Sequence, residues 1–140
     1  MCGLAGILSL EQGEPASLHE LESMASAMSA RGPDGSGVFQ RGALGLAHRR
    51  LRIIDLSDRG AQPMVDAALG LELSFNGCIY NYKELRQELQ ALGYAFFSDS
   101  DSEVILKGYH AWGVHCVERF NGMFAFALHE RDSGRLALAR

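Results

Sequence analysis

Long hydrophobic runs are absent from this sequence of 140 residues. The longest clear run covers residues 123–128, far short of the roughly 18 apolar residues that span a bilayer. No positively charged segment precedes the apolar stretch at residues 3–10, so this stretch is expected to be a strand rather than a secretion signal. The sequence therefore predicts no contact with a membrane.

Cysteine and positive charge are also sparse. The three cysteines, Cys2, Cys78 and Cys116, are odd in number and form no C-x-x-C pair, which favours a reducing compartment, and hence the cytoplasm, over a disulfide framework. His110, His115 and Cys116 match no familiar zinc spacing, so no metal site is predicted. The net charge of −4 and the lack of a Lys/Arg-rich run argue against a nucleic-acid surface.

Apolar residues, by contrast, make up 47% of the chain and charged residues 21%, which predicts one globular domain. Strand and helix patterns alternate without an internal repeat. Strands are expected at residues 4–10, 38–40, 44–48, 51–56, 71–75, 122–129 and 135–139. Helices are expected from the capping residue Ser17 to about Ala30, from the capping residue Asn81 to Gly93, and over residues 101–112 and 114–120.

Cys2 directly follows Met1. Removal of Met1 would leave a cysteine with a free α-amino group, so that one residue would hold a nucleophile and a base. An α-amino group titrates near pH ~8 and a thiol near ~8.5, so the amine can take the thiol proton, directly or through a water. The alternative is that this small, apolar start is only the first turn of a buried strand.

Asn76-Gly77 lies between apolar residues, where a tight hairpin turn is one interpretation. However, the helix signal at Asn81 follows too soon for a long return strand, so a strand-to-helix junction is favoured. At such a junction the Asn76 amide and the next backbone N–H can point at one spot, as stabilisation of a tetrahedral oxyanion requires. Gly77 allows a close approach because it lacks Cβ.

Charged residues in two segments suggest contacts with a small charged substrate. Arg49, Arg50 and Arg52 follow an expected strand, where alternation can turn one guanidinium toward a pocket to bind a carboxylate, or leave all three on a solvated face. Asp99 and Asp101 precede or begin an expected helix. They could simply favour the helix dipole, whereas a buried carboxylate there would hold a substrate ammonium.

Seven motifs occur in order along the chain: M-C-G-L-A-G at the start, R-G-P-D-G at residues 31–35, A-H-R-R-L-R-I-I-D at 47–55, G-A-Q-P-M at 60–64, F-N-G-C-I-Y-N at 75–81, S-D-S-E-V-I-L at 100–106 and F-N-G-M-F-A-F-A at 120–127. Together they resemble the class II glutamine amidotransferase domain of glutamine-hydrolysing asparagine synthetases. The resemblance covers essentially the whole chain.

This resemblance implies an α+β, N-terminal-nucleophile hydrolase fold, a four-layer αββα sandwich of two antiparallel sheets. It implies hydrolysis of L-glutamine to glutamate and ammonia through a thioester on Cys2. Asn76 and Gly77 would form the oxyanion hole. Arg50 would bind the α-carboxylate of glutamine and Asp101 its α-ammonium. The pocket would be completed by Leu51, Arg52, Ile53, Ile54 and Cys78.

Cys78 stands where many asparagine synthetases have Glu, and the N-G-C-I-Y-N form looks most like the N-acetylglutaminylglutamine amide synthase branch. Family members continue beyond the position of Arg140 with the rest of the glutaminase domain and a synthetase domain. Residues 1–140 are therefore interpreted as an incomplete glutaminase domain, truncated at its C-terminus, with no cofactor of its own. ATP and Mg are implied only for the synthetase domain that would be its partner.

Several alternatives remain at this stage. The domain could be catalytically silent and only dock to a synthetase partner, or it could be a stand-alone amide hydrolase that acts on peptides or acyl amines. Its last strand is expected to be an unprotected sheet edge through which copies could associate, so a homodimer stays open.

Overall fold

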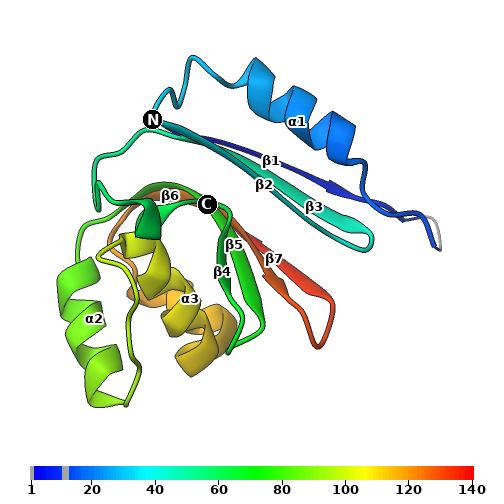
Figure 1. Ribbon diagram of the computed structural model, residues 1–140. Helices are drawn as coiled ribbons and strands as arrows, with labels where there is room; N and C mark the ends of the chain where they lie inside the picture. Colours follow the sequence, from blue (N-terminus) through cyan, green and yellow to red (C-terminus); the bar gives the residue numbers. More distant parts are fainter. Residues whose placement is uncertain (1, 11–12) are drawn as a thin grey trace.

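Two antiparallel sheets form the middle of the molecule (Figure 1). The structure is a computed structural model that describes residues 2–10 and 13–140, so the predicted removal of Met1 concerns a residue outside the described ones. Within these residues the first sheet has the strand order β1-β3-β2, with β1 Gly3–Leu8, β2 Gly35–Arg41 and β3 Leu44–Arg50. The second has the order β4-β5-β6-β7, with β4 Met64–Asp66, β5 Leu71–Ile79, β6 Gly122–Glu130 and β7 Arg135–Ala139.

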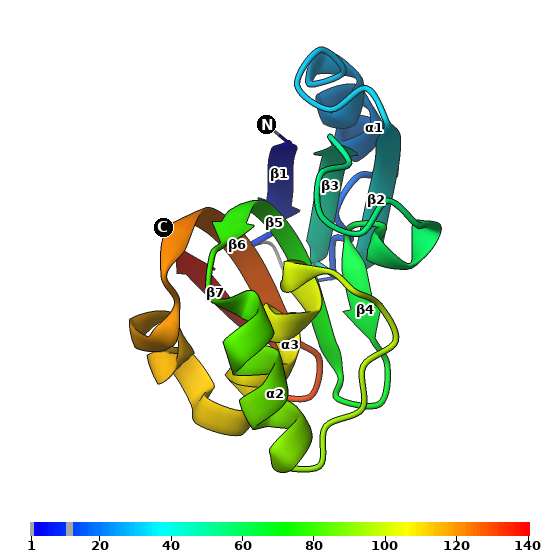
Figure 2. The same ribbon diagram turned by 90° about the vertical axis from the view of Figure 1, so that its left-hand side faces the viewer.

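Helices cover the outer side of each sheet (Figures 1 and 2). Helix α1, Leu18–Ala27, lies on the three-stranded sheet, while α2, Tyr82–Ala91, and α3, Asp101–Trp112, lie on the outer side of the four-stranded one. Two 3₁₀ helices are η1 Asp58–Gly60 and η2 Gly113–Arg119. The order helix, sheet, sheet, helix confirms the predicted four-layer α+β sandwich.

The alternation of side chains along β5 explains how one strand serves two layers. Its odd-numbered residues pack with the helices in the largest hydrophobic cluster, and these are Leu71, Leu73, Phe75 and Ile79. Its even-numbered residues face the other sheet, where Ser74 donates a hydrogen bond to the carbonyl oxygen of Ala47 at 3.5 Å. Between the sheets, Leu44 and Leu46 pack on Ala127. Burying each such leucine stabilises the fold by about 1.5–3 kcal/mol.

Three of the four predicted helices are confirmed as the α-helices α1, α2 and α3, and their ends lie within three residues of the predicted ones. Helix α1 starts after Ser17, whose hydroxyl accepts a hydrogen bond from the Glu20 backbone N–H at 3.3 Å, but it ends at Ala27 instead of Ala30. Helix α3 has the predicted bounds and is capped by Ser100. The helix predicted at residues 114–120 is the 3₁₀ helix η2.

Asn81 precedes α2 as predicted, but its predicted capping bond is wrong. The side chain bonds to a segment distant in sequence: its amide nitrogen donates to the carbonyl oxygen of Arg119 at 3.0 Å, and its amide oxygen accepts from the backbone N–H of Asn121 at 2.9 Å. Asn81 therefore joins the start of α2 to the start of β6.

The strand predicted at residues 51–56 is wrong, because β3 ends at Arg50 and the chain then follows an irregular path. The Arg50 guanidinium donates hydrogen bonds to the carbonyl oxygens of Ile54, Asp55 and Ser57, so these carbonyls turn toward a side chain and not toward a neighbouring strand. Conversely, β4 was not predicted, since three residues are too few to show an alternating pattern.

Asn76 and Gly77 lie inside β5, which continues to Ile79 before α2 begins at Tyr82. Asn76 is paired with Ala125 and Gly77 with Phe124 across the β5–β6 ladder. The hairpin interpretation is therefore excluded, and the strand ends at Ile79, four residues beyond the predicted end at residue 75.

The strands predicted at residues 122–129 and 135–139 are confirmed as β6 and β7, which pair as an antiparallel hairpin. In the described part of the chain β7 pairs only with β6, so it forms one edge of its sheet. None of the helices over residues 2–10 and 13–140 has the length and hydropathy that a membrane crossing requires.

Candidate active site

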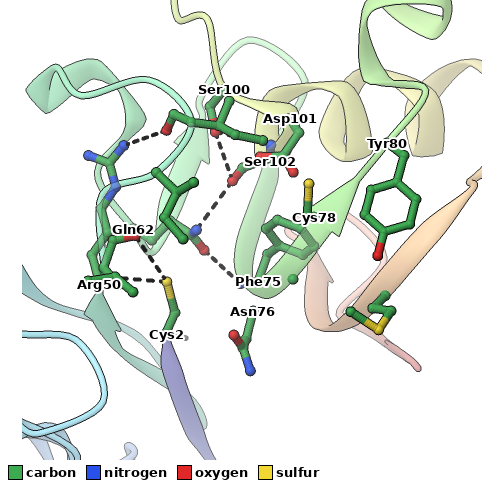
Figure 3. Close-up of a pocket in the computed structure, with 15 residues that line it drawn as sticks. Cys2, Arg50, Gln62, Phe75, Asn76, Cys78, Tyr80, Ser100, Asp101 and Ser102 are labelled. Atoms are coloured by element: carbon green, nitrogen blue, oxygen red, sulfur yellow. Dashed lines mark hydrogen bonds between the residues drawn. The ribbon is translucent and has the colours of Figure 1, made fainter.

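One pocket of about 260 Å³ opens where the ends of β1, β3, β5 and α3 meet (Figure 3). Cys2 stands at one side of it, and the start of α3 lies opposite. Nine of the predicted site residues line this pocket: Cys2, Arg50, Leu51, Ile53, Ile54, Asn76, Gly77, Cys78 and Asp101. Residues 99 sequence positions apart are thus brought to one cavity, while their predicted chemical roles stay predictions.

The Cys2 thiol is oriented by the loop that follows β3. Its Sγ accepts a hydrogen bond from the Leu51 backbone N–H at 3.3 Å, and its S–H donates to the Leu51 carbonyl oxygen at 3.7 Å. The carbonyl of Cys2 accepts a hydrogen bond from Nε of Arg31 at 3.1 Å. Both the side chain and the main chain of the proposed nucleophile are therefore held by polar contacts.

The R-G-P-D-G segment at residues 31–35 packs against the end of β3. The backbone N–H of Asp34 donates to the Arg50 carbonyl oxygen at 3.0 Å, and the Asp34 carboxylate accepts from the Arg52 backbone N–H at 3.0 Å. The Gly32 carbonyl accepts from Nε of Arg49 at 3.0 Å. This turn places Arg31 next to Cys2 and fixes the start of the pocket loop.

Arg50 is buried, and its guanidinium donates to the carbonyl oxygens of Ser57 at 2.8 Å, of Ile54 at 3.4 Å and of Asp55. Burial lowers the pKa of Arg50, and the neighbouring positive charge of Arg52 lowers it further. Gly60 lies so close to the guanidinium that a Cβ there would collide with it. Arg50 thus organises the loop that forms one wall of the pocket, in addition to lining the pocket itself.

Arg52, which the resemblance places at the pocket, is not among the residues that line it in this structure. It lies in the loop that follows β3, which ends at Arg50. Its guanidinium instead binds the Leu56 carbonyl oxygen at 2.8 Å and the Asp58 carboxylate at 2.7 Å.

The edge of β5 that faces the pocket carries backbone N–H groups with different partners. In an antiparallel strand the N–H and C=O of a residue point to the same side, and the side alternates along the chain. The N–H of Phe75 donates to Oε1 of Gln62 at 2.6 Å, and that of Ile79 to Oδ2 of Asp101 at 3.0 Å. By alternation the N–H of Gly77 lies between them and points to the same edge.

Asn76 is one of the even-numbered residues of β5, whose side chains face the other sheet. Its side chain lies toward Cys2 (Figure 3). A side-chain amide and a backbone N–H thus flank the thiol side of the pocket, the arrangement that a tetrahedral oxyanion needs. Gly77 has a φ of 157° and packs so closely on Met123 and Phe124 of β6 that a Cβ would collide with their backbone. Only glycine lets β5 keep this position.

Asp101 is almost fully buried at the start of α3, and this burial raises its pKa although several hydrogen bonds stabilise the carboxylate. Cys78 lies nearby, and burial together with the charge of Asp101 raises the pKa of its thiol. Cys78 is therefore a neutral pocket group, and Asp101 is the pocket's buried acid.

Several residues without a predicted role also shape the site. Gln62, Ser100, Ser102, Tyr80 and Met123 line the pocket. Gln62 belongs to the G-A-Q-P-M motif, which contributes to the family resemblance but by itself indicates no role for this side chain. Ser100 and Ser102 flank Asp101 at the start of α3. The Ser100 hydroxyl bonds to that of Ser102, and the Ser102 hydroxyl also binds Gln62, which is 40 positions away.

The pocket is thus lined by a thiol, a side-chain amide, a guanidinium and a buried carboxyl group. The fold that carries it resembles that of glutamine phosphoribosylpyrophosphate amidotransferase from B. subtilis, with a TM-score of 0.65 over 91% of this chain and 35% of that one, at 16% sequence identity. This likeness shows that the chain has the fold of an N-terminal-nucleophile amidotransferase.

The glutamine amidotransferase domain model matches residues 1–140, and the chain belongs to this family. It is 35% identical to asparagine synthetase [glutamine-hydrolyzing] 3 of Bacillus subtilis over the whole of this chain and 23% of that protein. It is 34% identical to asparagine synthetase [glutamine-hydrolyzing] 1 of Arabidopsis thaliana, over the whole of this chain and 24% of that protein. The chain thus spans about a quarter of the length of these relatives.

Proposed function

We propose that this domain hydrolyses L-glutamine to glutamate and ammonia through a thioester on Cys2. The observation that carries the proposal is the gathering of Cys2, Asn76, Gly77, Arg50 and Asp101 around one small pocket in a chain that belongs to the glutamine amidotransferase domain family. Glutamine offers a carboxylate, an ammonium and a reacting amide. The pocket supplies a cation, an anion and an oxyanion site for these three groups.

In the proposed reaction the α-amine of Cys2, freed by removal of Met1, takes the thiol proton. The sulfur attacks the side-chain carbonyl carbon of glutamine, and the oxyanion of the tetrahedral intermediate accepts hydrogen bonds from the Asn76 amide and the Gly77 N–H. The protonated amine gives its proton to the departing nitrogen, and ammonia leaves. Water then attacks the thioester in the same manner, which releases glutamate and restores the thiol.

The ammonia is proposed to supply an ATP-dependent amidation of the asparagine synthetase type in a further domain of the parent protein. This proposal rests on the relatives, which are named as glutamine-hydrolysing asparagine synthetases and are about four times as long. ATP and Mg belong to that domain, while the glutaminase half-reaction uses only the groups described here. Cys78 and the N-G-C-I-Y-N motif support, as a second proposal, an N-acetylglutaminylglutamine amide as the product.

The cytoplasm and a homodimer are further proposals. Three free cysteines in the described chain support a reducing compartment. The edge of β7, where Leu138 is exposed, supports association through this strand.

Release of glutamate from glutamine tests the proposed reaction. The full chain, with Met1 removed as checked by intact mass, is expected to release glutamate and ammonia in equal amounts, and Cys2→Ala is expected to abolish both. Cys116→Ala, which removes a thiol buried in the core, serves as the matched control and is expected to lose stability but keep glutaminase activity. Undiminished release by Cys2→Ala would overturn the mechanism, and an inactive wild type would favour a domain that only docks to a partner.

A further inference from the structure

A buried side chain replaces the missing part of strand β4 beside the pocket. Strand β4 begins at Met64, which pairs with Leu73 of β5. The residue before it, Pro63, has no N–H and cannot extend the ladder. The next outward-facing backbone groups of β5, those of Phe75, therefore have no strand partner on this side within the described residues, and a buried N–H without a partner is costly.

Gln62 supplies the acceptor. Its Oε1 accepts the hydrogen bond from the Phe75 N–H at 2.6 Å, and its amide nitrogen donates to Oγ of Ser102 at 3.2 Å (Figure 3). Ser102 in turn accepts from the Ser100 hydroxyl at 3.0 Å. Gln62 is only 9% exposed, and Ser100 and Ser102 are more deeply buried, so water does not compete strongly for these bonds.

The carbonyl of Phe75 is fixed from the other sheet. Nε2 of His48, on β3, lies 2.9 Å from the Phe75 carbonyl oxygen and donates to it. Both polar groups of the Phe75 backbone thus bind side chains, one from the loop before β4 and one from β3. On the edge away from β6, side chains therefore hold the backbone that leads into Asn76 where, within the described residues, no strand pairs with it.

These contacts connect the two ends of the proposed substrate site. Phe75 directly precedes Asn76, and Ser102 directly follows Asp101. We infer that Gln62 is a positioning residue that sets the distance between the oxyanion donors of β5 and the ammonium-binding carboxylate of α3. This inference rests on the proposed glutaminase function and assigns Gln62 no direct contact with the reacting atoms.

The inference predicts a particular kinetic effect. Loss of a whole oxyanion donor lowers kcat by on the order of 10²–10³-fold. A donor that is only displaced is expected to lower kcat by a smaller factor. Gln62→Met keeps the size of the side chain but removes both of its hydrogen bonds. We expect Gln62→Met to lower kcat for glutamine hydrolysis about 10- to 100-fold, with KM changed less than about threefold.

Two further variants separate positioning from stability. Gln62→Glu keeps the acceptor for the Phe75 N–H and is expected to recover at least several-fold of the kcat lost in Gln62→Met. Ser74→Ala removes another buried hydrogen bond of the same strand, to Ala47, on the face away from the Phe75 edge. Ser74→Ala is expected to lower the thermal midpoint and leave kcat unchanged.

A glutamine analogue with an aldehyde in place of the side-chain amide gives a readout of the oxyanion site itself. The Cys2 thiol adds to the aldehyde carbon, and the proton moves to the oxygen, which then occupies the oxyanion hole as a thiohemiacetal. Gln62→Met is expected to weaken inhibition by this aldehyde by about the same factor as kcat. Binding of glutamate, which has no tetrahedral carbon at this site, is expected to stay within threefold.

The outcomes distinguish this inference from the function on which it rests. A full chain that releases no glutamate contradicts the proposed function. An active wild type whose Gln62→Met and Gln62→Glu variants both retain kcat and aldehyde affinity overturns the role of Gln62 alone. If Gln62→Met does not fold, Ser102→Ala decides, because it removes the α3 end of the Gln62 contact and leaves the Phe75 N–H with its acceptor. Ser102→Ala is expected to lower kcat and aldehyde affinity together, and wild-type values of both would equally overturn the role of Gln62.

Discussion

Cys2 and Leu51 are hydrogen-bonded to each other, with 3.3 Å between Sγ and the Leu51 nitrogen and 3.7 Å between Sγ and the Leu51 carbonyl oxygen. The N–H of Leu51 stabilises a thiolate, and its carbonyl orients the thiol proton. Because Leu51 directly follows the buried Arg50, the position of the nucleophile depends on the loop that Arg50 organises.

Arg31 holds the nucleophilic residue by its main chain, through the hydrogen bond from Nε to the Cys2 carbonyl oxygen at 3.1 Å. A hydrogen bond from a charged donor contributes about 1.5–3 kcal/mol when shielded and less when exposed, as this one is. Arg31→Gln is therefore expected to lower kcat for glutamine hydrolysis by about fivefold. Arg135→Gln, an exposed change on β7, is the control, and equal kcat values for both variants would contradict the role of Arg31.

Arg50 is expected to affect stability and substrate binding together. Arg50→Lys retains the charge but cannot donate to the carbonyl oxygens of Ile54, Asp55 and Ser57 at once, so the thermal midpoint is expected to fall by several degrees. KM for glutamine is expected to rise at least tenfold, because the carboxylate loses its planar partner.

A substrate without an α-carboxylate separates these two roles of Arg50. Turnover of glutamine amide, in which the carboxylate is an amide, is expected to be equally poor in the wild type and in Arg50→Lys once both are fully folded. If Arg50→Lys discriminates between glutamine and glutamine amide as strongly as the wild type does, Arg50 does not bind the carboxylate, and the domain is better described as a general amide hydrolase.

The sequence predicted most helices and strands because their signals are local. Ser17 and Ser100 cap helices within three residues of themselves, and the buried leucines of β5 alternate as a strand requires. The failures come from long-range contacts. Asn81 bonds to residues about 40 positions away, and the Arg50 side chain draws in carbonyls that would otherwise have formed a strand.

The candidate site was likewise predicted where sequence motifs carry the signal, and missed where long-range contacts do. The resemblance identified Cys2, Arg50 and Asp101 by their motifs, and the structure brings them to one pocket. The resemblance also placed Arg52 at the pocket, but its guanidinium binds the Leu56 carbonyl oxygen and the Asp58 carboxylate. The role of Gln62 could not be predicted from the sequence, since its partners Phe75 and Ser102 are 13 and 40 positions away.

His48 is expected to make the fold sensitive to acid. It is fully buried, and burial is the main cause that lowers its pKa from 6.5 to about 4. Between these values the unfolded chain binds a proton that the folded chain does not, so the free energy of unfolding falls as the pH falls from 6.5 toward 4. The loss is at most about 3 kcal/mol, at about 1.4 kcal/mol per pKa unit.

Urea unfolding at a series of pH values measures this effect. His48→Gln is expected to be less stable at pH 7 and to show a flatter dependence on pH below 6.5. His115→Gln, which changes an exposed imidazole that binds Glu118, is expected to keep the wild-type slope. A wild-type stability that stays constant between pH 6.5 and 4.5 would show that His48 does not control it.

Asp101 is expected to control the pH dependence of KM. Binding of the α-ammonium requires the carboxylate, and burial raises the pKa of this group above its usual 3.8. KM for glutamine is therefore expected to rise as the pH falls through this raised pKa.

Asp101→Asn is expected to raise KM at least about 30-fold, because a lost buried charge partner costs about 2–5 kcal/mol. It is also expected to remove the rise of KM at low pH. Asp99→Asn, at an exposed carboxylate two residues away, is the control that should retain it.

The three thiols are expected to react with iodoacetamide in a fixed order. Cys116 is wholly buried, and burial raises its pKa to about 11, so it should react only on unfolding. Cys78 lines the pocket with a pKa raised by burial and by Asp101, so it should react slowly, and faster in Asp101→Asn. Cys2, which accepts a hydrogen bond from the Leu51 N–H, should react first and be protected by glutamine.

Peptide mapping by mass spectrometry at pH 7.5 measures the labelling of each cysteine. Faster labelling of Cys78 than of Cys2 in the chain lacking Met1 would contradict the assignment of Cys2 as nucleophile.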